Sequence, residues 1–345
     1  MLRQIVEVLE EYDLYGWTID ELGTGLINQT WKCQLDDGQK LVLQCVNRVF
    51  PASVNDDINT VVEHLKSKGK VTPEFVRNYG GALVTPYADD IWRLMTYVDG
   101  HSVDALENAD QAREAGAALA DFHANVADLD MTFSHQRPHV HDTVRHIQNL
   151  CDALEQHADH PRFAEIAPLA EMILTSAAAL PAMDLDKVRL VHGDPKISNL
   201  LFDQNNKAVC WVDLDTLAYM PLALEMGDAF RSWCNPESED AESPEFSLEY
   251  LAAAAEGYAS RSQGFITEQE WRSFVDGTQT VLVELSARFC ADALNESYFG
   301  WNPDKFATRG EHNEARARNQ MKVLESFIKQ HEEISAAVER AFTGA

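Results

Sequence analysis

A histidine, several acidic residues, a lysine and an asparagine lie close together in one segment of this 345-residue chain. The segment reads His192-Gly-Asp194-Pro-Lys196-Ile-Ser-Asn199 and, further on, Val212-Asp213-Leu214-Asp215. Apolar runs flank both halves, as in short buried strands, and residues 204–206 between them suit a hairpin turn. Such a hairpin would carry both acid-bearing loops to the same end of a domain. Carboxylates grouped in this way can accept a proton or bind a divalent cation.

The order and spacing of these residues resemble the catalytic loop and the metal-binding aspartate of the protein-kinase superfamily. Phosphoryl transfer needs a carboxylate for the acceptor hydroxyl, oxygen ligands for Mg²⁺ and positive charge near the moving phosphoryl group. The resemblance implies that Asp194 accepts or orients the hydroxyl proton. It makes Lys196 the cation at the γ-phosphate, and Asn199 and Asp213 the Mg²⁺ ligands.

An ordinary polar turn is the simpler explanation for a lone His-x-Asp or Asp-x-Asp pattern. Here several positions agree in order and spacing around an intervening apolar strand, which favours the kinase-type interpretation. His192 is then a structural residue that holds the loop and does not transfer a proton, and Asp215 likewise has a supporting role.

Two features of the segment differ from protein kinases. Gly193 follows the histidine, and no phenylalanine-glycine pair follows Asp213. Both features, together with residues 119–124, resemble the aminoglycoside phosphotransferase and choline kinase branch, which phosphorylates small molecules. The resemblance implies an α+β, bilobal, protein-kinase-like fold and ATP and Mg²⁺ as cofactors. We expect a small β-rich N-lobe at residues 1–98 and a larger, mainly helical C-lobe at residues 99–345.

Composition agrees with a two-lobed enzyme that acts on a small molecule. With 45% hydrophobic residues, the chain can bury a large core. No apolar run approaches the roughly 20 residues of a membrane helix. Within residues 1–16, apolar residues recur at helical spacing with acids between them, which predicts an amphipathic helix and not a signal peptide. Scattered cysteines without a metal or disulfide pattern predict a cytoplasmic protein. The net charge of −28 argues against nucleic acid or a membrane as partner, and we expect a monomer.

The pattern of the N-lobe predicts strands at residues 30–35 and 41–46, joined by an Asp37-Gly38 turn. A helix with an apolar face at residues 58–65 follows, and further strands are expected near residues 82–86 and 92–97. In the C-lobe, residues 267–270 form a plausible capping box that opens a helix towards Arg288.

Residues 23–30 precede the first of these strands, where kinases fold a loop over the ATP phosphates. Gly25 permits close approach of the backbone, while Asn28 and Thr30 can hydrogen-bond phosphate oxygens. An ordinary turn explains the local pattern equally well, and the position upstream of the catalytic loop favours the nucleotide. At the other side of the lobe, Thr96 and Val98 would pair their backbone with adenine.

Gln44 occupies the strand position at which kinases present a lysine or arginine. Glu63, on the following helix, is its expected partner, and the contact would be a hydrogen bond instead of an ion pair. The cation for the α- and β-phosphates stays undetermined, with Lys32 and Arg48 as possibilities.

The region around Gln44 also resembles N-acetylhexosamine 1-kinases, as do residues 141–143, 212–231 and 288–298. This resemblance implies that Asp194 receives the anomeric hydroxyl of N-acetylglucosamine or N-acetylgalactosamine. It implies that Arg288 and Tyr298 contact the sugar, and it makes Asp228 and Arg231 a structural pair that braces the loops.

Alternatives remain for these residues and for the acceptor. Arg288 would pair with Asp292 on a helix surface if it does not bind substrate, and Tyr298 would be a core aromatic or give its place to Phe299. An aminoglycoside, choline or another amino-alcohol is the alternative acceptor, and the acidic residues 237–240 agree with it. A pseudokinase that binds nucleotide without catalysis is the non-enzyme alternative, for which Gln44 argues.

Overall fold

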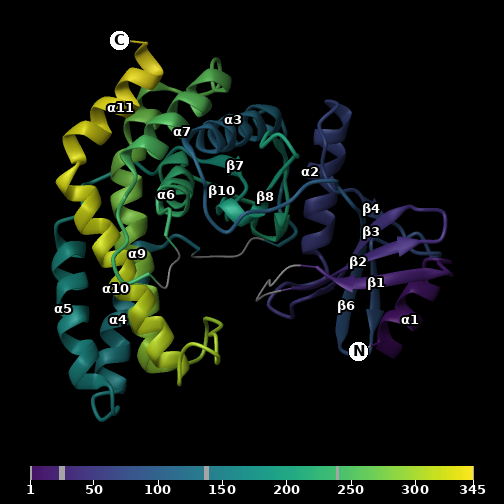
Figure 1. The fold of residues 1–345 in the computed structure, drawn as a ribbon, viewed down its shortest axis with the longest axis horizontal. Helices are drawn as coiled ribbons and strands as arrows, with labels where there is room; N and C mark the ends of the chain where they lie inside the picture. Colours follow the sequence, from purple (N-terminus) through teal and green to yellow (C-terminus); the bar gives the residue numbers. More distant parts are fainter. Residues whose placement is uncertain (1, 23–27, 136–139, 238–240, 345) are drawn as a thin grey trace. The chain divides into compact units, whose positions relative to one another are not determined.

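The computed structural model describes residues 2–22, 28–135, 140–237 and 241–344, and Figure 1 shows the fold. The chain divides into two units. The sheet unit comprises residues 1–100, 128–136 and 210–217, and the helical unit comprises residues 101–127, 137–209 and 218–345. A β-sheet in one unit and mainly helices in the other confirm the predicted α+β fold class.

The sheet unit is built on an antiparallel sheet with the strand order β1-β2-β3-β6-β4, in which β5 also pairs with β6. Its elements are α1 (Leu2–Glu10), β1 (Trp17–Glu21), β2 (Gln29–Leu35), β3 (Lys40–Val46), α2 (Val54–Ser67), β4 (Phe75–Val76), β5 (Val84–Tyr87), β6 (Asp90–Thr96) and the short 3₁₀ helix η2 (Leu214–Thr216). The strands predicted at 30–35 and 41–46 correspond to β2 and β3. The sequence analysis missed β1, whose side chains are half-buried or exposed, and the two-residue β4.

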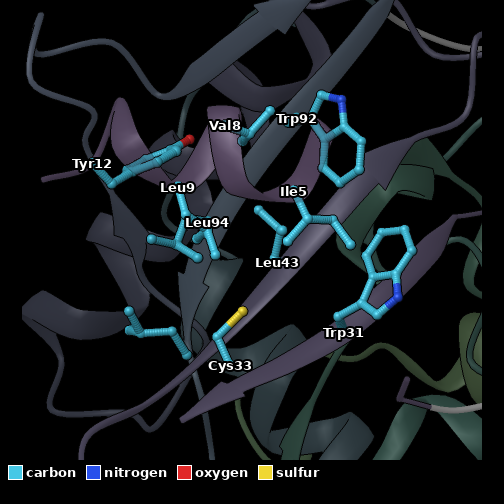
Figure 2. Close-up of a cluster of buried hydrophobic side chains, with 10 residues drawn as sticks. Ile5, Val8, Leu9, Tyr12, Trp31, Cys33, Leu43, Trp92 and Leu94 are labelled. Carbon is cyan, nitrogen blue, oxygen red and sulfur yellow. The ribbon is translucent and has the colours of Figure 1, made fainter. Parts of the chain in front are cut away.

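The core of the sheet unit lies between α1 and the sheet. Figure 2 shows that Ile5, Val8 and Leu9 of α1 approach apolar side chains of β2, β3 and β6, and all of these groups are buried. The rings of Trp31 and Trp92 stack with their centroids 5.4 Å apart. This packing explains the amphipathic pattern of the first helix, because the apolar face covers the sheet.

The helical unit contains the remaining helices and two small sheets, in which β7 pairs with β10 and β8 pairs with β9. Its elements are α3 (Ala109–Val126), α4 (Thr143–Gln156), α5 (Phe163–Ala178), β7 (Arg189–Val191), η1 (Ile197–Asn199), β8 (Leu200–Phe202), β9 (Ala208–Trp211), β10 (Ala218–Met220), α6 (Leu222–Trp233), α7 (Leu248–Arg261), α8 (Glu268–Arg272), α9 (Phe274–Asn295), α10 (Arg309–Lys329) and α11 (His331–Thr343). The unit boundary falls within β9. The strands predicted before and after the turn at residues 204–206 are present as β8 and β9. Asn206, within this turn, lies in the left-handed region at φ 58°.

Helix α9 is the central helix of this unit. Most of its residues are buried, and it packs against α4, α5, α6 and α10. The predicted capping box is present at the N-terminus of α8, the short helix before α9. The Thr267 hydroxyl accepts from the Glu270 backbone N–H, and the Glu270 carboxylate accepts from the Thr267 backbone N–H. The helix that it opens was predicted to run on towards Arg288. That prediction is wrong, because α8 ends at Arg272 and α9 begins at Phe274.

Among the described residues, no helix combines the length and the apolar character needed to cross a membrane.

Candidate active site

The predicted catalytic loop, residues 192–199, follows β7, includes η1 and leads into β8 in the helical unit. Gly193 has φ 83°, a left-handed conformation that a side chain would strain. The turn aims the backbone N–H groups of His192 and Gly193 at the carboxylate of Glu225 on α6, with both N···O distances at 3.1 Å. Glu225 is fully buried, so these bonds supply the compensation that a buried carboxylate requires.

His123 connects a second helix to the same carboxylate. Its Nε2 lies 3.4 Å from Glu225 Oε1, and its Nδ1 lies 2.8 Å from the hydroxyl of Tyr258. Burial, together with the Glu225 charge, raises the pKa of Tyr258 well above its ordinary value, so the phenol stays protonated. His123 of the segment 119–124, which the sequence analysis used only for the family resemblance, thus supports the loop at residues 192–199.

The other side of the loop rests on the C-terminal end of α6. The Ile197 backbone N–H donates to the Ser232 hydroxyl at 3.2 Å, and the Trp233 indole donates to the Pro195 carbonyl at 2.8 Å. Glu225 and these two residues hold the loop at both ends. The sequence analysis missed all three, because on a buried helix they resemble ordinary core positions.

Asp194 presents a carboxylate that is only partly covered, with 24% of its side chain exposed. Lys196 Nζ lies 2.9 Å from Asp194 Oδ2. The Asn199 amide nitrogen donates to the Asp194 carbonyl at 2.9 Å and to its carboxylate at 3.2 Å. The structure therefore brings together the predicted hydroxyl-binding group, the predicted cation and one predicted metal ligand.

A cluster of buried charges lies along α6 and α9. Arg231 Nη2 is 2.8 Å from Asp228 Oδ1, which is the ion pair that the sequence resemblance implied. Burial alone would raise the pKa of Asp228, but the charges of Arg231, His141 and Arg288 lower it. The Asp228 carboxylate is thus ionised and neutralised by cations around it.

Glu284 holds the start of α4 against α9. His141 Nδ1 lies 2.9 Å from one carboxylate oxygen, and the Thr143 hydroxyl donates to the other at 2.8 Å. Burial lowers the pKa of His141, but the charge and the hydrogen bond of Glu284, together with the Asp228 charge, outweigh it and the net shift is upward. His141 and Thr143 belong to a segment that the resemblance to N-acetylhexosamine 1-kinases covers, whereas Glu284 lies just before the segment at residues 288–298.

A pair of glycines sets the separation of α6 and α9. A Cβ on Gly277 would lie 1.9 Å from the Ala223 carbonyl oxygen, and one on Gly227 would lie 2.5 Å from the Gly277 carbonyl oxygen. The helix backbones can approach this closely only because neither residue has a side chain. The approach brings Asp228, the neighbour of Gly227, next to the charged residues of α9.

Arg288 lies near both aromatic rings of the loop that follows α9. Its guanidinium carbon is 5.9 Å from the centre of the Tyr298 ring and 5.5 Å from that of Phe299. Asp292, the alternative partner of Arg288, accepts the backbone N–H groups of residues 297–299. The alternative of Tyr298 as a core aromatic is wrong, because the residue is 54% exposed.

The second acidic segment belongs to the sheet unit. Asp213 precedes η2 with φ 62° and ψ 56°, a left-handed conformation that costs a non-glycine residue about 1 kcal/mol or more. Asp215, two residues later, makes a double contact with Arg93, through distances of 2.6 Å and 2.9 Å. Asn28 Nδ2 adds a third hydrogen bond to Asp215 at 2.5 Å.

Gln44 is a neutral member of this network. Its amide nitrogen donates to the Thr30 hydroxyl at 3.1 Å, and its amide oxygen accepts from Arg93 Nε at 2.8 Å. The prediction that Glu63 is the partner of Gln44 is wrong, because Glu63 is exposed on α2. This helix joins the network through Asn55, which accepts a hydrogen bond from Arg93. The sequence analysis missed Arg93, although a basic residue inside an apolar strand was a signal for it.

The remaining nucleotide predictions fall on the same unit. The Thr96 backbone N–H donates to the Glu74 carbonyl at 2.8 Å, and its hydroxyl accepts from the Glu74 N–H at 2.8 Å. Val98 follows β6 and is half-buried. Gly25 lies outside the described residues. The two basic residues considered for the phosphates pair elsewhere, Lys32 with Asp20 and Arg48 with Asp90.

Within the described residues, no group of three or more His, Cys, Asp or Glu side chains is arranged to hold a metal ion. Mg²⁺ does not require one, because it is commonly held by one or two protein oxygens together with substrate phosphates. The Asn199 amide nitrogen donates to Asp194, which leaves its oxygen as the ligand end. An amide oxygen and the Asp213 carboxylate are the donor types that Mg²⁺ prefers.

Solved structures with the same fold include an aminoglycoside phosphotransferase from Alicyclobacillus acidocaldarius, 15% identical, with a TM-score of 0.65 and coverage of 95% of this chain and 96% of that one. A microcompartment-associated aminopropanol kinase is 16% identical, with a TM-score of 0.62 and 99% of each chain covered. An amicoumacin kinase, solved with AMP-PNP, Ca²⁺ and Ami, is 14% identical, with a TM-score of 0.62 and 93% of each chain covered.

The sequence itself matches a protein family over a long stretch. The matched residues are 18–263, which include the first strands, the catalytic loop, the Asp213 segment and all of α6. Since this match covers more than half of the chain, the protein belongs to the phosphotransferase enzyme family.

Proposed function

We propose that this protein is a Mg²⁺- and ATP-dependent kinase that phosphorylates the anomeric hydroxyl of an N-acetylhexosamine. The observation that carries the proposal is the catalytic loop, in which Lys196 and Asn199 contact a partly exposed Asp194 carboxylate. Backbone bonds to Glu225 preorganise this loop. Membership of the phosphotransferase family supports the reaction class.

Each residue of the loop has a role in this proposal. Asp194 orients the acceptor hydroxyl and takes its proton, while Lys196 provides positive charge at the γ-phosphoryl group. Asn199 and Asp213 hold Mg²⁺ through their side-chain oxygens, and the ion supplies neutralisation of the phosphate charge. His192 and the Asp228–Arg231 pair support the loop and take no part in proton transfer.

The nucleotide is assigned to the sheet unit. We place adenine against the backbone of Thr96 and Val98. The Thr96 N–H donates to Glu74, so its carbonyl is the group assigned to the adenine amine. The phosphates are assigned to Gly25, Asn28 and Thr30, with Gln44 in contact with Thr30.

A neutral acceptor agrees with the charges of the helical unit. The buried carboxylates of Glu225, Asp228 and Glu284 each contact backbone N–H groups, a guanidinium or a histidine, so they are compensated within the protein. A site for a polycation needs carboxylates that are available to the ligand. Arg288, next to the exposed ring of Tyr298, instead provides a fork of donors and an aromatic surface suited to sugar hydroxyls and C–H groups.

An amino-group acceptor is the second candidate, and a specific observation favours it. The solved structures with this fold include an aminoglycoside phosphotransferase and an aminopropanol kinase. The net charge of −28 would also attract a cationic acceptor to the surface.

A coupled assay of ADP release across N-acetylhexosamines, amino-alcohols and aminoglycosides separates these candidates. The proposal expects turnover with a free N-acetylhexosamine, and coupling between ³¹P and H1 of the product. Phosphate on C6, or turnover of methyl glycosides with a blocked anomeric position, would contradict it. Preference for an amino-alcohol or an antibiotic would establish the second candidate, and ATP binding without any acceptor-stimulated turnover would indicate a pseudokinase.

We also propose a cytoplasmic location, which the cysteines support. All six are free thiols, and burial raises the pKa of Cys33 to about 11 and that of Cys210 and Cys290 to about 12. Thiols of this kind stay protonated and unreactive, as in a reducing compartment.

A further inference from the structure

Arg93 is a buried cation at the centre of the network that reaches the Asp213 segment. Its side chain is 2% exposed, and Nε, Nη1 and Nη2 all donate to protein groups. The acceptors are Gln44 on β3, Asn55 on α2 and the carboxylate of Asp215 in η2. One side chain thus ties together a strand, a helix and the metal-binding segment.

The charge of Arg93 is compensated by Asp215, whose side chain is 1% exposed. Two parallel N–H···O bonds at 2.6 Å and 2.9 Å make the contact directional as well as attractive. A lysine could not reproduce this geometry, because an ammonium lacks the planar fork of donors. The pair therefore fixes the orientation of the Asp215 side chain and of the turn that carries it.

Strand register shows how this cation relates to the missing kinase lysine. Gln44 is aligned with Arg93 across the β3–β6 pair, and with Thr30 across the β2–β3 pair. The chain therefore has a neutral residue on the strand where kinases place a cation, and has an arginine directly opposite on the next strand. The buried positive charge therefore lies on β6, next to the strand of Gln44, and the acid that it contacts is Asp215.

The turn beyond Arg93 contains a strained residue. Asp213 adopts φ 62° and ψ 56°, and η2 follows immediately with Asp215 inside it. A left-handed aspartate persists only where its surroundings hold it. The bonds from Arg93 and Asn28 to Asp215 provide such a restraint two residues away.

We propose that Arg93 is a positioning residue that acts through Asp215 to fix the backbone of Asp213 for the metal–nucleotide complex. The inference deepens the proposed function and rests on it. Arg93 does not contact phosphate in this scheme, because its donors are directed at protein acceptors and its side chain is covered. The cation thus contributes by placing a metal ligand, whereas a kinase lysine acts on the phosphates themselves.

Binding of AMP-PNP to the full-length protein, measured by calorimetry while Mg²⁺ is titrated, tests this role without catalysis. The variants are Arg93→Met, Arg93→Lys, Asp215→Leu and the double variant Arg93→Met/Asp215→Leu. We expect the Mg²⁺ concentration for half-maximal binding to rise about 10- to 100-fold in Arg93→Met and Asp215→Leu. The Mg²⁺ concentration for half-maximal binding in Arg93→Lys should lie between the values for wild type and Arg93→Met. The exposed Arg3, paired with Glu7, provides the matched control Arg3→Met, which should leave the Mg²⁺ midpoint unchanged.

The double variant distinguishes positioning from direct contact. If Arg93 acts only through Asp215, the double variant should have the same raised Mg²⁺ midpoint as Asp215→Leu. A double variant with the wild-type midpoint would overturn the proposal, as would one at least tenfold worse than Asp215→Leu. A single variant leaves one buried charge unpaired and can fail to fold, whereas the double variant removes both charges and keeps the comparison with wild type available.

The wild-type titration separates the two levels of inference. Absence of AMP-PNP binding at every Mg²⁺ concentration would refute the proposed function, and the role of Arg93 with it. Mg²⁺-dependent binding by wild type, with variants that match it, would refute only the role of Arg93.

Discussion

The carboxylate of Glu225 accepts the backbone N–H of His192 at 3.1 Å, although the two residues belong to different elements and are 33 positions apart. The same carboxylate accepts from Gly193 and lies beside His123. The catalytic loop is therefore held from α6 by an anion that is itself buried. Because every bond to Glu225 depends on this charge, the order of the loop depends on it as well.

Replacing Glu225 by glutamine should lower stability and activity together. The amide would present an NH₂ group to donors that need an acceptor, and an unsatisfied buried donor costs about 1–3 kcal/mol. We expect a lower urea midpoint and reduced kcat for Glu225→Gln. Glu249→Gln, an exposed change in the first turn of α7, is the matched control. An unchanged urea midpoint in Glu225→Gln would show that the carboxylate does not hold the loop.

Substitutions of Asp194 and Asp213 should affect turnover and nucleotide binding differently. Asp194→Asn is expected to lower kcat by about 10²- to 10⁴-fold and to leave nucleotide affinity close to wild type, because only the acid–base group is lost. Asp213→Ala should abolish Mg²⁺-dependent nucleotide binding in addition to turnover. Steady-state kinetics and calorimetry measure the two effects. Near-normal kcat in Asp194→Asn would refute the role assigned to Asp194.

The contact between α6 and α9 should tolerate no side chain at Gly277. The added Cβ of Gly277→Ala would lie 1.9 Å from the Ala223 carbonyl, so the helices must separate. Overpacking of this kind costs about 1–3 kcal/mol. Thermal unfolding should show a clear loss of Tm, while Gly80→Ala, whose Cβ would find its nearest atom at 3.5 Å, should keep it. Equal Tm values for the two variants would refute the close approach of the helices.

Local patterns predicted the parts of this molecule that depend on neighbouring residues. Three predicted features depend on spacing within a few positions. They are the grouping of Asp194 with Lys196 and Asn199, the strands β2 and β3, and the capping box of Thr267. The predicted helix towards Arg288 was wrong because the pattern shows where a helix opens. It does not show that the helix is interrupted at Ser273, because the apolar periodicity continues on both sides of this residue.

Long-range pairs could not be predicted in the same way. Arg93 and Asp215 are 122 positions apart, and His141 and Glu284 are 143 apart, so neither pair leaves a local signature. Glu63 was chosen as the partner of Gln44 by analogy with kinases, yet Gln44 bonds to Thr30 and Arg93, and the same helix reaches the network through the bond from Arg93 to Asn55. Local sequence patterns predict many of the elements, but they do not show which buried polar groups these elements bring together. The roles of the site residues themselves stay predictions.

Glu270 should make stability depend on acid pH. Burial alone would raise the pKa of this carboxyl, but Arg189, Thr267 and Lys187 lower it to about 2. Because the folded pKa lies below the unfolded value of about 4.5, the stabilisation is present above pH 4.5 and is lost as the pH falls towards 2. Glu270→Gln should therefore lower Tm at pH 7, and its difference from wild type should shrink as the pH falls below about 4.5. A constant difference from pH 7 to pH 3 would contradict this linkage.

Arg288→Lys should weaken binding of the acceptor and leave binding of the nucleotide unchanged. The guanidinium lies near the rings of Tyr298 and Phe299, where its planar fork can hold two sugar hydroxyls, and an ammonium cannot reproduce that geometry. Loss of a charged hydrogen bond of about 1.5–3 kcal/mol predicts a rise of about 10- to 100-fold in the KM for N-acetylglucosamine. The KM for ATP should stay constant, because the nucleotide is assigned to the other unit. Arg272→Lys, an exposed change on α8, is the control and should alter neither constant. If Arg288→Lys instead raises the KM for ATP and leaves that for the sugar unchanged, Arg288 is not part of the acceptor site.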